Sequence, residues 1–99
     1  MTDSTRRIVG LILEVPKGRV CCYRDIAIKA GFPNGARQVA RLLHSLSEKH
    51  GLPWHRIVRH DGSIALGEGA GKELQMALLR SEGVEVSPGG KVDMRRFGV

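Results

Sequence analysis

Apolar side chains recur at the spacing of an amphipathic helix in four stretches of the sequence. This periodicity predicts helices over residues 4–15, 24–30, 36–47 and 72–82. The third stretch has the clearest stripe, which is formed by Val39, Leu42, Leu43 and Leu46. Ser4 or Asp3 is placed to cap the first helix, and Gly31 and Gly83 follow the second and fourth as stop signals.

Shorter apolar runs between turn residues predict a small amount of β structure. Residues 20–23 are expected to be extended, and residues 55–59 and 63–65 are expected to form a hairpin joined by Asp61-Gly62. Residues 84–86 and 92–94 are expected to pair across Pro88-Gly89-Gly90. The predicted fold class is therefore mainly α with small β hairpins, in a single domain over residues 1–99.

Residues 24–47 combine two helices with a short connection rich in turn residues, Phe32-Pro33-Asn34-Gly35. This order is typical of a helix-turn-helix, and a following hairpin would make it a winged helix-turn-helix DNA-binding domain. A small helical bundle has the same spacing, so the pattern leaves both interpretations open. The residues expected to contact DNA lie on the later of these two helices, over residues 36–47. They are Ala36, Arg37, Gln38, Ala40 and Arg41.

The charge distribution favours a polyanionic partner. The formal net charge is +6, and residues 15–60 carry nine Lys or Arg against two Asp or Glu. Such clustering is typical of nucleic-acid-binding proteins, although a generally basic surface gives the same count. No apolar run approaches the roughly 18–20 residues of a membrane span, and the first residues lack a secretory pattern. We therefore expect a cytoplasmic protein, associated with the nucleoid if it is bacterial, without a membrane partner.

Other kinds of chemical site are disfavoured by the sequence. Cys21 and Cys22 are adjacent, which strains a disulfide, so both are predicted to be free thiols. The four histidines do not share a helix face, which disfavours a metal site. Gly71-Lys72 is followed by Glu73, where a phosphate-binding loop needs Ser or Thr. No cofactor is expected.

A series of short motifs extends over roughly residues 8–86. It includes Val15-Pro16-Lys17-Gly18-Arg19-Val20, Gly31-Phe32-Pro33, Ala36-Arg37-Gln38-Val39 and Pro53-Trp54-His55-Arg56-Ile57-Val58. Their order and spacing resemble the C-terminal DNA-binding domain of the O6-alkylguanine-DNA alkyltransferases. In that family the last motif carries the alkyl-accepting Cys at the position of Trp54. The chain is therefore similar to the alkyltransferase-like proteins, which bind O6-alkylguanine in DNA without removing the alkyl group.

The resemblance implies roles for residues that would contact the damaged nucleotide. Arg37 matches the family's finger, which enters the duplex in place of the flipped nucleotide. Tyr23 matches the Tyr that crowds the 3′ phosphate and promotes rotation. Trp54 and Tyr23 would form the wall of a lesion pocket, and the pocket would be completed by Ile57 and Ile64.

The resemblance also implies that the chain is not an enzyme. An indole has no lone pair for attack on an alkyl group, so His55 and Glu82 are expected to form only a structural hydrogen-bond network. The expected function is a damage sensor that flips O6-alkylguanine and marks it for nucleotide excision repair. The expected partners are duplex DNA with this lesion and the excision-repair proteins, contacted by a monomer. Two alternatives are a winged-helix transcription regulator and an active methyltransferase with another nucleophile.

Overall fold

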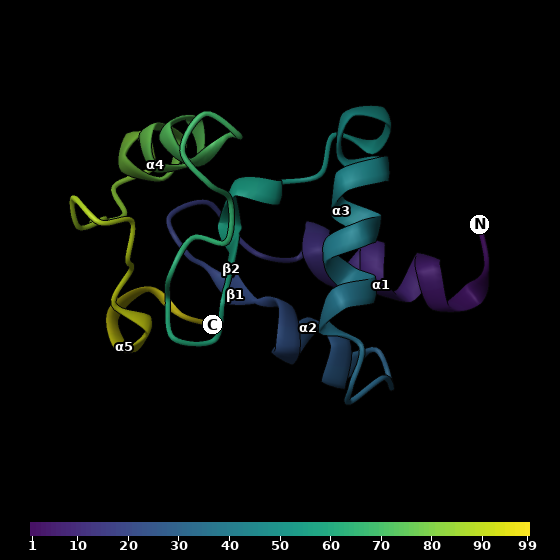
Figure 1. The fold of residues 1–99 in the computed structure, drawn as a ribbon. Helices are drawn as coiled ribbons and strands as arrows, with labels where there is room; N and C mark the ends of the chain where they lie inside the picture. The colour runs from purple at the N-terminus through teal and green to yellow at the C-terminus, as the bar shows by residue number, and fades with distance from the viewer.

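A computed structural model of residues 1–99 contains five α-helices, one 3-10 helix and two short strands. In chain order these are α1 (Asp3–Leu13), β1 (Cys21–Cys22), α2 (Tyr23–Lys29), α3 (Ala36–His50), η1 (Trp54–Arg56), β2 (Ile57–Val58), α4 (Lys72–Ser81) and α5 (Met94–Phe97). The first three helices lie on one side of the strand pair, and α4 and α5 lie on the other (Figure 1). None of the helices has the length and hydropathy needed to cross a bilayer.

The helix ends follow local capping chemistry. The Thr2 side chain accepts a hydrogen bond from the Thr5 backbone N–H, so Thr2 caps α1 and the expectation of Ser4 or Asp3 is wrong. Helix α3 continues three residues beyond the predicted end and stops at Gly51, whose φ of 61° is left-handed. The apolar stripe ends earlier than the helix, because the last turn of α3 is polar.

The two strands form a parallel pair. Cys21 lies opposite Ile57 and Cys22 opposite Val58. The hairpin predicted between residues 55–59 and 63–65 is therefore wrong, although the Arg59 N–H donates to Ser63 O across a turn at Asp61. The longer-range pairing of β2 with β1 takes the place of the predicted ladder.

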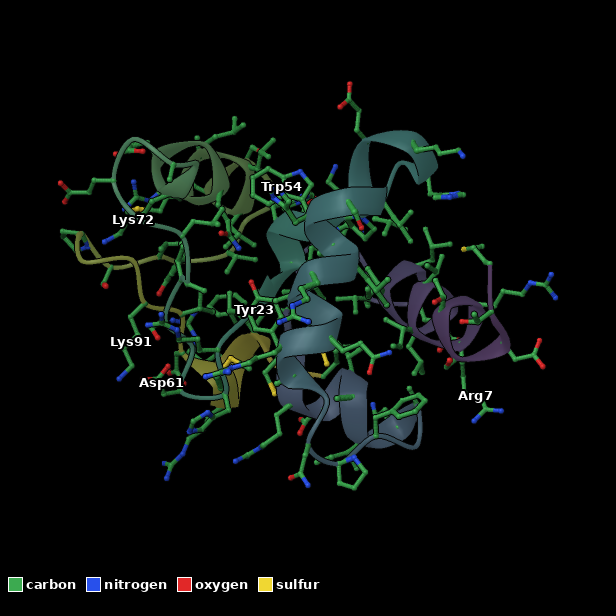
Figure 2. All side chains as sticks on the ribbon, turned by 45° about the vertical axis from the view of Figure 1, so that its right-hand side comes forward. Arg7, Tyr23, Trp54, Asp61, Lys72 and Lys91 are labelled. Carbon is green, nitrogen blue, oxygen red and sulfur yellow. The ribbon has the colours of Figure 1, made fainter.

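The C-terminal segment pairs with the residues that were expected to form the hairpin. Ser63 bridges Lys91, and the Ile64 N–H donates to Gly90 O at 2.9 Å. Figure 2 shows Asp61 and Lys91 on neighbouring segments. The bridge between Val86 and Val92 agrees with the predicted pairing across Pro88-Gly89-Gly90. Met94 begins α5 rather than continuing a strand, because Asp93 caps that helix.

Two hydrophobic clusters hold the fold together. The N-terminal core consists of Ile8, Val9, Ile12, Val15, Cys21, Ile26, Ala27, Ala30, Val39, Leu43, Leu52 and Ile57. The C-terminal core consists of Val20, Val58, Ile64, Leu79, Val84, Val86 and Val92. The strand pair contributes to both cores, because successive side chains of a strand point to opposite faces. The mainly helical fold class is confirmed, and α2 and α3 occupy the predicted helix-turn-helix region.

Candidate nucleic-acid interface

The outer face of α3 combines small and basic side chains. Arg37, Gln38, Ala40 and Arg41 are exposed, whereas Ala36 at the start of the helix is half-buried. Neither arginine forms an ion pair within the chain. The predicted DNA-contacting residues therefore share a helix whose guanidinium groups are free to meet phosphates or bases.

Most of the basic residues between positions 15 and 60 are exposed. The exception is Arg56, which is partly buried and points inward. The exposed members are Lys17, Arg19, Arg24, Lys29, Arg37, Arg41, Lys49 and Arg59. This part of the surface carries only two acidic residues, so its charge suits a polyanion.

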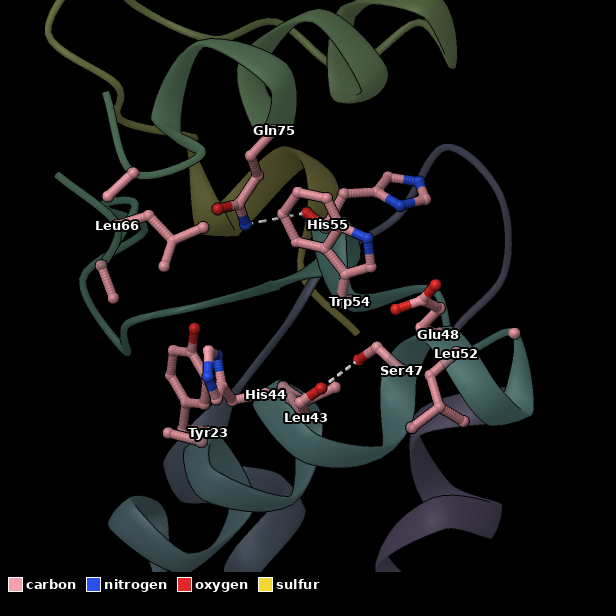
Figure 3. Close-up of a pocket in the computed structure, with 14 residues that line it drawn as sticks. Tyr23, Leu43, His44, Ser47, Glu48, Leu52, Trp54, His55, Leu66 and Gln75 are labelled. Atoms are coloured by element: carbon pink, nitrogen blue, oxygen red, sulfur yellow. Dashed lines mark hydrogen bonds between the residues drawn. The ribbon is translucent and has the colours of Figure 1, made fainter. Parts of the chain in front are cut away.

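A cavity of about 750 Å³ lies beside α3. Its lining comes from α2, α3, η1, the loop over residues 65–70 and α4 (Figure 3). The size falls within the roughly 300–1,000 Å³ typical of small-ligand pockets. Tyr23 and Trp54 both line it, as predicted, and Figure 2 shows them along the same side of α3. The pocket therefore opens next to the exposed basic helix.

Two residues expected on the pocket wall lie elsewhere. Ile57 is 0% exposed in the N-terminal core, and Ile64 is 6% exposed in the C-terminal core. Pairing of β2 with β1 turns Ile57 inward, and the hydrogen bond to Gly90 holds the backbone of Ile64 at the C-terminal core. The structure corrects both expectations, because neither residue lines the cavity.

The sequence did not predict several of the residues that line the pocket. His44 and Ser47 belong to α3, Leu66 to the loop, and Gln75 to α4. His44 could have been found, because it continues the polar stripe of Arg37 along the same helix. Gln75 is four residues before buried Leu79, so helical spacing places it on the inner face of α4.

Trp54 is held at the pocket by the η1 turn. Pro53 precedes the turn, and the Trp54 N–H donates to Leu52 O at 2.8 Å. The indole packs against the N-terminal core and meets the His55 ring edge-on, with 6.1 Å between centroids. A large flat apolar surface therefore faces the cavity from a backbone turn that is fixed on both sides.

The Glu82 carboxylate joins three distant segments behind this turn. It accepts hydrogen bonds from Arg56 Nη2 at 2.8 Å, from His55 Nε2 at 2.7 Å and from the Gly18 N–H at 3.2 Å. Arg56 also donates to Val15 O at 3.0 Å. The predicted His55–Glu82 bond is present, and the structure adds Arg56 as a charged donor to the same carboxylate.

These bonds fix the charge state of the network. Hydrogen bonds from Arg56 are the main cause that lowers the pKa of Glu82 from 4.5 to about 2, and the His55 bond adds to the effect. Glu82 is therefore a carboxylate at neutral pH, and His55 Nε2 is the donor between them. The network positions the Trp54 turn and presents no free carboxylate to the pocket.

The other groups with nucleophilic chemistry are poorly placed or protonated. Cys21 and Cys22 are each 2% exposed and do not line the cavity. Burial raises the pKa of both thiols. Burial also raises the pKa of Tyr23, so its phenol stays a neutral O–H donor at the pocket. No group of three or more His, Cys, Asp or Glu side chains is arranged to hold a metal ion.

Comparison with known proteins agrees with this arrangement. Residues 3–84 match the family described as "6-O-methylguanine DNA methyltransferase, DNA binding domain". A DNA base-flipping protein of Escherichia coli is 40% identical over 92 residues, covering 93% of this chain and 70% of that protein. Alkyltransferase-like protein 1 of Schizosaccharomyces pombe is 33% identical over 87 residues, covering 87% of this chain and 81% of that protein.

A solved structure shows the same fold. The S. pombe protein Atl1, crystallised with damaged DNA containing O6-carboxymethylguanine, aligns with a TM-score of 0.87 and 29% identity. The alignment covers 98% of this chain and 94% of Atl1. The similarity therefore includes the helix-turn-helix, the pocket turn and the C-terminal half. The chain belongs to the 6-O-methylguanine DNA methyltransferase DNA-binding-domain family, together with its base-flipping and alkyltransferase-like proteins.

Proposed function

We propose that this protein binds duplex DNA containing O6-alkylguanine, rotates the damaged nucleotide out of the stack and holds the base without removing the alkyl group. The observation that carries the proposal is the cavity walled by Trp54 and Tyr23 beside the exposed basic face of α3. The relatives named for base flipping and the damaged-DNA complex of Atl1 support the same conclusion.

The absence of transfer follows from the groups at the pocket. Alkyl transfer needs a thiolate or similar nucleophile with a base beside it. Trp54 offers neither, and burial keeps Cys21 and Cys22 protonated away from the cavity. His55 and Glu82 bond to each other, so their role here is to hold the turn that carries Trp54.

Base flipping is assigned to Arg37 and Tyr23. Arg37 lies in the first turn of α3, exposed and without an internal partner, so it can fill the space that the nucleotide leaves. The small side chains Ala36 and Ala40 let the helix approach the duplex closely. Extrusion costs a few kcal/mol and is easier for a poorly paired base, so the lesion itself contributes selectivity.

The consequence for repair is a stable complex at the lesion. A monomer holding a flipped base in the cytoplasm would mark the site for nucleotide excision repair proteins. Phosphate contacts from the exposed lysines and arginines would supply much of the affinity, so binding should weaken steeply with salt.

The decisive experiment compares two duplexes that differ at one position, guanine or O6-methylguanine. We expect tighter binding to the damaged duplex, with a change in the fluorescence of the single tryptophan because Trp54 lines the pocket. The intact mass of the protein should stay unchanged after incubation. Equal affinity for both duplexes, with preference for an undamaged sequence, would instead identify a regulator, and a gain of one methyl group would identify an enzyme.

A further inference from the structure

Glu48 is the single acidic residue of α3 and lies in its last turn. It follows Arg37, Arg41 and His44 by eleven, seven and four residues, so helical spacing places it on the same stripe as those three side chains. Glu48 also lines the cavity, and Figure 3 shows its carboxylate on the side of α3 that faces Trp54. A negative charge therefore stands where the exposed basic face meets the pocket.

Contacts within the free protein do not favour this charge. Glu48 is exposed and forms no ion pair within the chain. An acidic side chain near the C-terminus of a helix also meets the negative end of the helix dipole. Asp25, the other acidic residue between positions 15 and 60, lies instead in the first turn of α2, where the dipole favours it. Glu48 thus works against both its helix and the basic surface that it interrupts.

An undistorted duplex brings phosphates close to this carboxylate. The stripe from Arg37 to Glu48 extends for about 16 Å at 1.5 Å per residue. One strand of B-DNA carries a phosphate every 3.4 Å along its axis, so about five phosphates pass over such a length. A straight backbone that is attracted to Arg37 and Arg41 is therefore carried on toward Glu48, where the interaction is repulsive.

A flipped base changes what Glu48 meets. When a nucleotide rotates into the cavity, its base passes the wall that Glu48 lines, and O6-alkylguanine carries no charge. The carboxylate then faces an uncharged ring in place of a phosphate, so the repulsion is weaker in the flipped complex than in the unflipped one. A charge that is penalised in only one of two complexes changes the ratio of their affinities, which is how repulsive contacts create specificity.

We propose that Glu48 repels the backbone of undamaged, unflipped DNA and so increases the preference of the protein for a duplex whose base has entered the pocket. This inference rests on the proposed function. The basic residues of α3 attract any duplex, and Glu48 weakens the attachment to undamaged DNA. Glu48 is therefore a specificity-determining residue that acts through repulsion.

The test compares Glu48→Gln with wild type on two duplexes of one sequence, which carry guanine or O6-methylguanine at the central position. Dissociation constants are measured by fluorescence anisotropy of labelled DNA. We expect Glu48→Gln to bind the guanine duplex about threefold more tightly, the size of one exposed charge interaction, and the O6-methylguanine duplex with nearly unchanged affinity. The preference for the lesion should therefore fall about threefold.

Glu14→Gln is the matched control, because Glu14 is exposed at the end of α1 and likewise forms no ion pair. It removes the same charge away from α3 and should leave the preference unchanged. An equal gain on both duplexes for Glu48→Gln, or an equal loss of preference in Glu14→Gln, overturns the proposal, because net charge alone then explains the result. Unaltered affinity of Glu48→Gln for the guanine duplex overturns it as well.

Glu48→Lys gives a stronger version of the same comparison. Reversal of the charge should tighten binding to the guanine duplex by about tenfold, since the change in charge is twice as large. Both effects should shrink as the salt concentration rises, because exposed charges are screened. A loss of preference that does not depend on salt would reveal a change in local packing and would also overturn the proposal.

Wild type separates this inference from the proposed function. If wild type binds the guanine and O6-methylguanine duplexes equally, the proposed function fails. If wild type prefers the lesion and Glu48→Gln keeps the whole of that preference, only the role of Glu48 fails.

Discussion

The two cores of this small protein are built in different ways. The N-terminal core is formed mainly by α1, α2 and α3, and each of these helices packs against the next one along the chain. The C-terminal core has one helix of ten residues, α4, and otherwise consists of turns, single bridges and the four-residue α5. The pocket lies between them, with helical residues on one wall and the loop over residues 65–70 on the other.

The difference shows how an exposed basic helix and a pocket with one loop wall share one short chain. The basic face lies on α3, a regular helix of 15 residues. The C-terminal half is bound to them by long-range contacts, since the Val20 N–H donates to Phe97 O and the Val99 N–H donates to Val20 O. Together with the Glu82 network, these contacts predict that both cores unfold in one cooperative step.

The largest effects test that cooperativity. We expect Ile12→Ala in the N-terminal core and Leu79→Ala in the C-terminal core each to lower the free energy of unfolding by about 3 kcal/mol, because both side chains are fully buried. Denaturant titrations followed by circular dichroism and by Trp54 fluorescence should give one coincident transition. Two separate transitions would show that the cores are independent, and exposed Leu74→Ala serves as the control.

The connection between the cores should depend on pH. The pKa of Glu82 is lowered from 4.5 to about 2, so ionised Glu82 stabilises the fold by about 3 kcal/mol at neutral pH. This contribution is fully present above pH 4.5 and is lost as the pH falls through 2. The stability gap between wild type and Glu82→Gln should therefore shrink between pH 5 and 2.

A surface pair provides the reference for this measurement. Glu85 pairs with Arg96 at an exposed site, so Glu85→Gln should leave the unfolding midpoint and its pH dependence close to those of wild type. A gap for Glu82→Gln that stays constant from pH 7 to 2 would contradict the assigned charge of the carboxylate.

On the loop side of the molecule, stability should depend on a glycine whose backbone conformation other residues rarely adopt. Gly62 has a φ of 91°, and a Cβ there would meet Val92 O. We expect Gly62→Ala to lower the free energy of unfolding by about 2 kcal/mol through strain and lost pairing with the C-terminal segment. Thermal melts measure this effect, and Gly67→Ala, which has open space around it, should melt near the wild-type temperature.

On the helical side, a substitution at the exposed face of α3 should change DNA binding and leave stability unaffected. Arg37 is exposed and unpaired, so Arg37→Ala should leave stability unchanged within error. We expect it to weaken binding to the O6-methylguanine duplex by about tenfold and to abolish flipping, detected with a fluorescent base analogue next to the lesion. Arg95→Ala on α5 removes the same charge elsewhere, and an equal loss in that variant would remove Arg37 from the finger role.

The two halves also differ in how far they could be predicted. Helical periodicity identified α1, α2, α3 and α4, because each buries one face with local spacing. The parallel pairing of β1 with β2 depends on residues more than thirty positions apart, so local turn signals at Asp61-Gly62 predicted a hairpin instead. Ile57 and Ile64 were misplaced for the same reason.

Site residues were predicted correctly where the chemistry of the side chain itself indicates a role. Tyr23 and Trp54 line the pocket, and His55 and Glu82 bond as expected. Arg56 was counted only among the nine clustered basic residues, because nothing in its sequence neighbours reveals that it turns inward to Glu82. The two carbonyl partners of Gln75 lie 20 and 18 positions away in the sequence, so local spacing does not reveal them.

The Glu82 carboxylate has a consequence for the order in which this chain matures during synthesis. Its partners at Gly18, His55 and Arg56 leave the ribosome well before α4 does. A nascent chain thus exposes the residues of α1, α2 and α3 while the turn under Trp54 still lacks its anchor. Such a chain would already expose cations to any polyanion nearby, including ribosomal RNA. The proposed discrimination of damage would begin only when the last third of the protein docks.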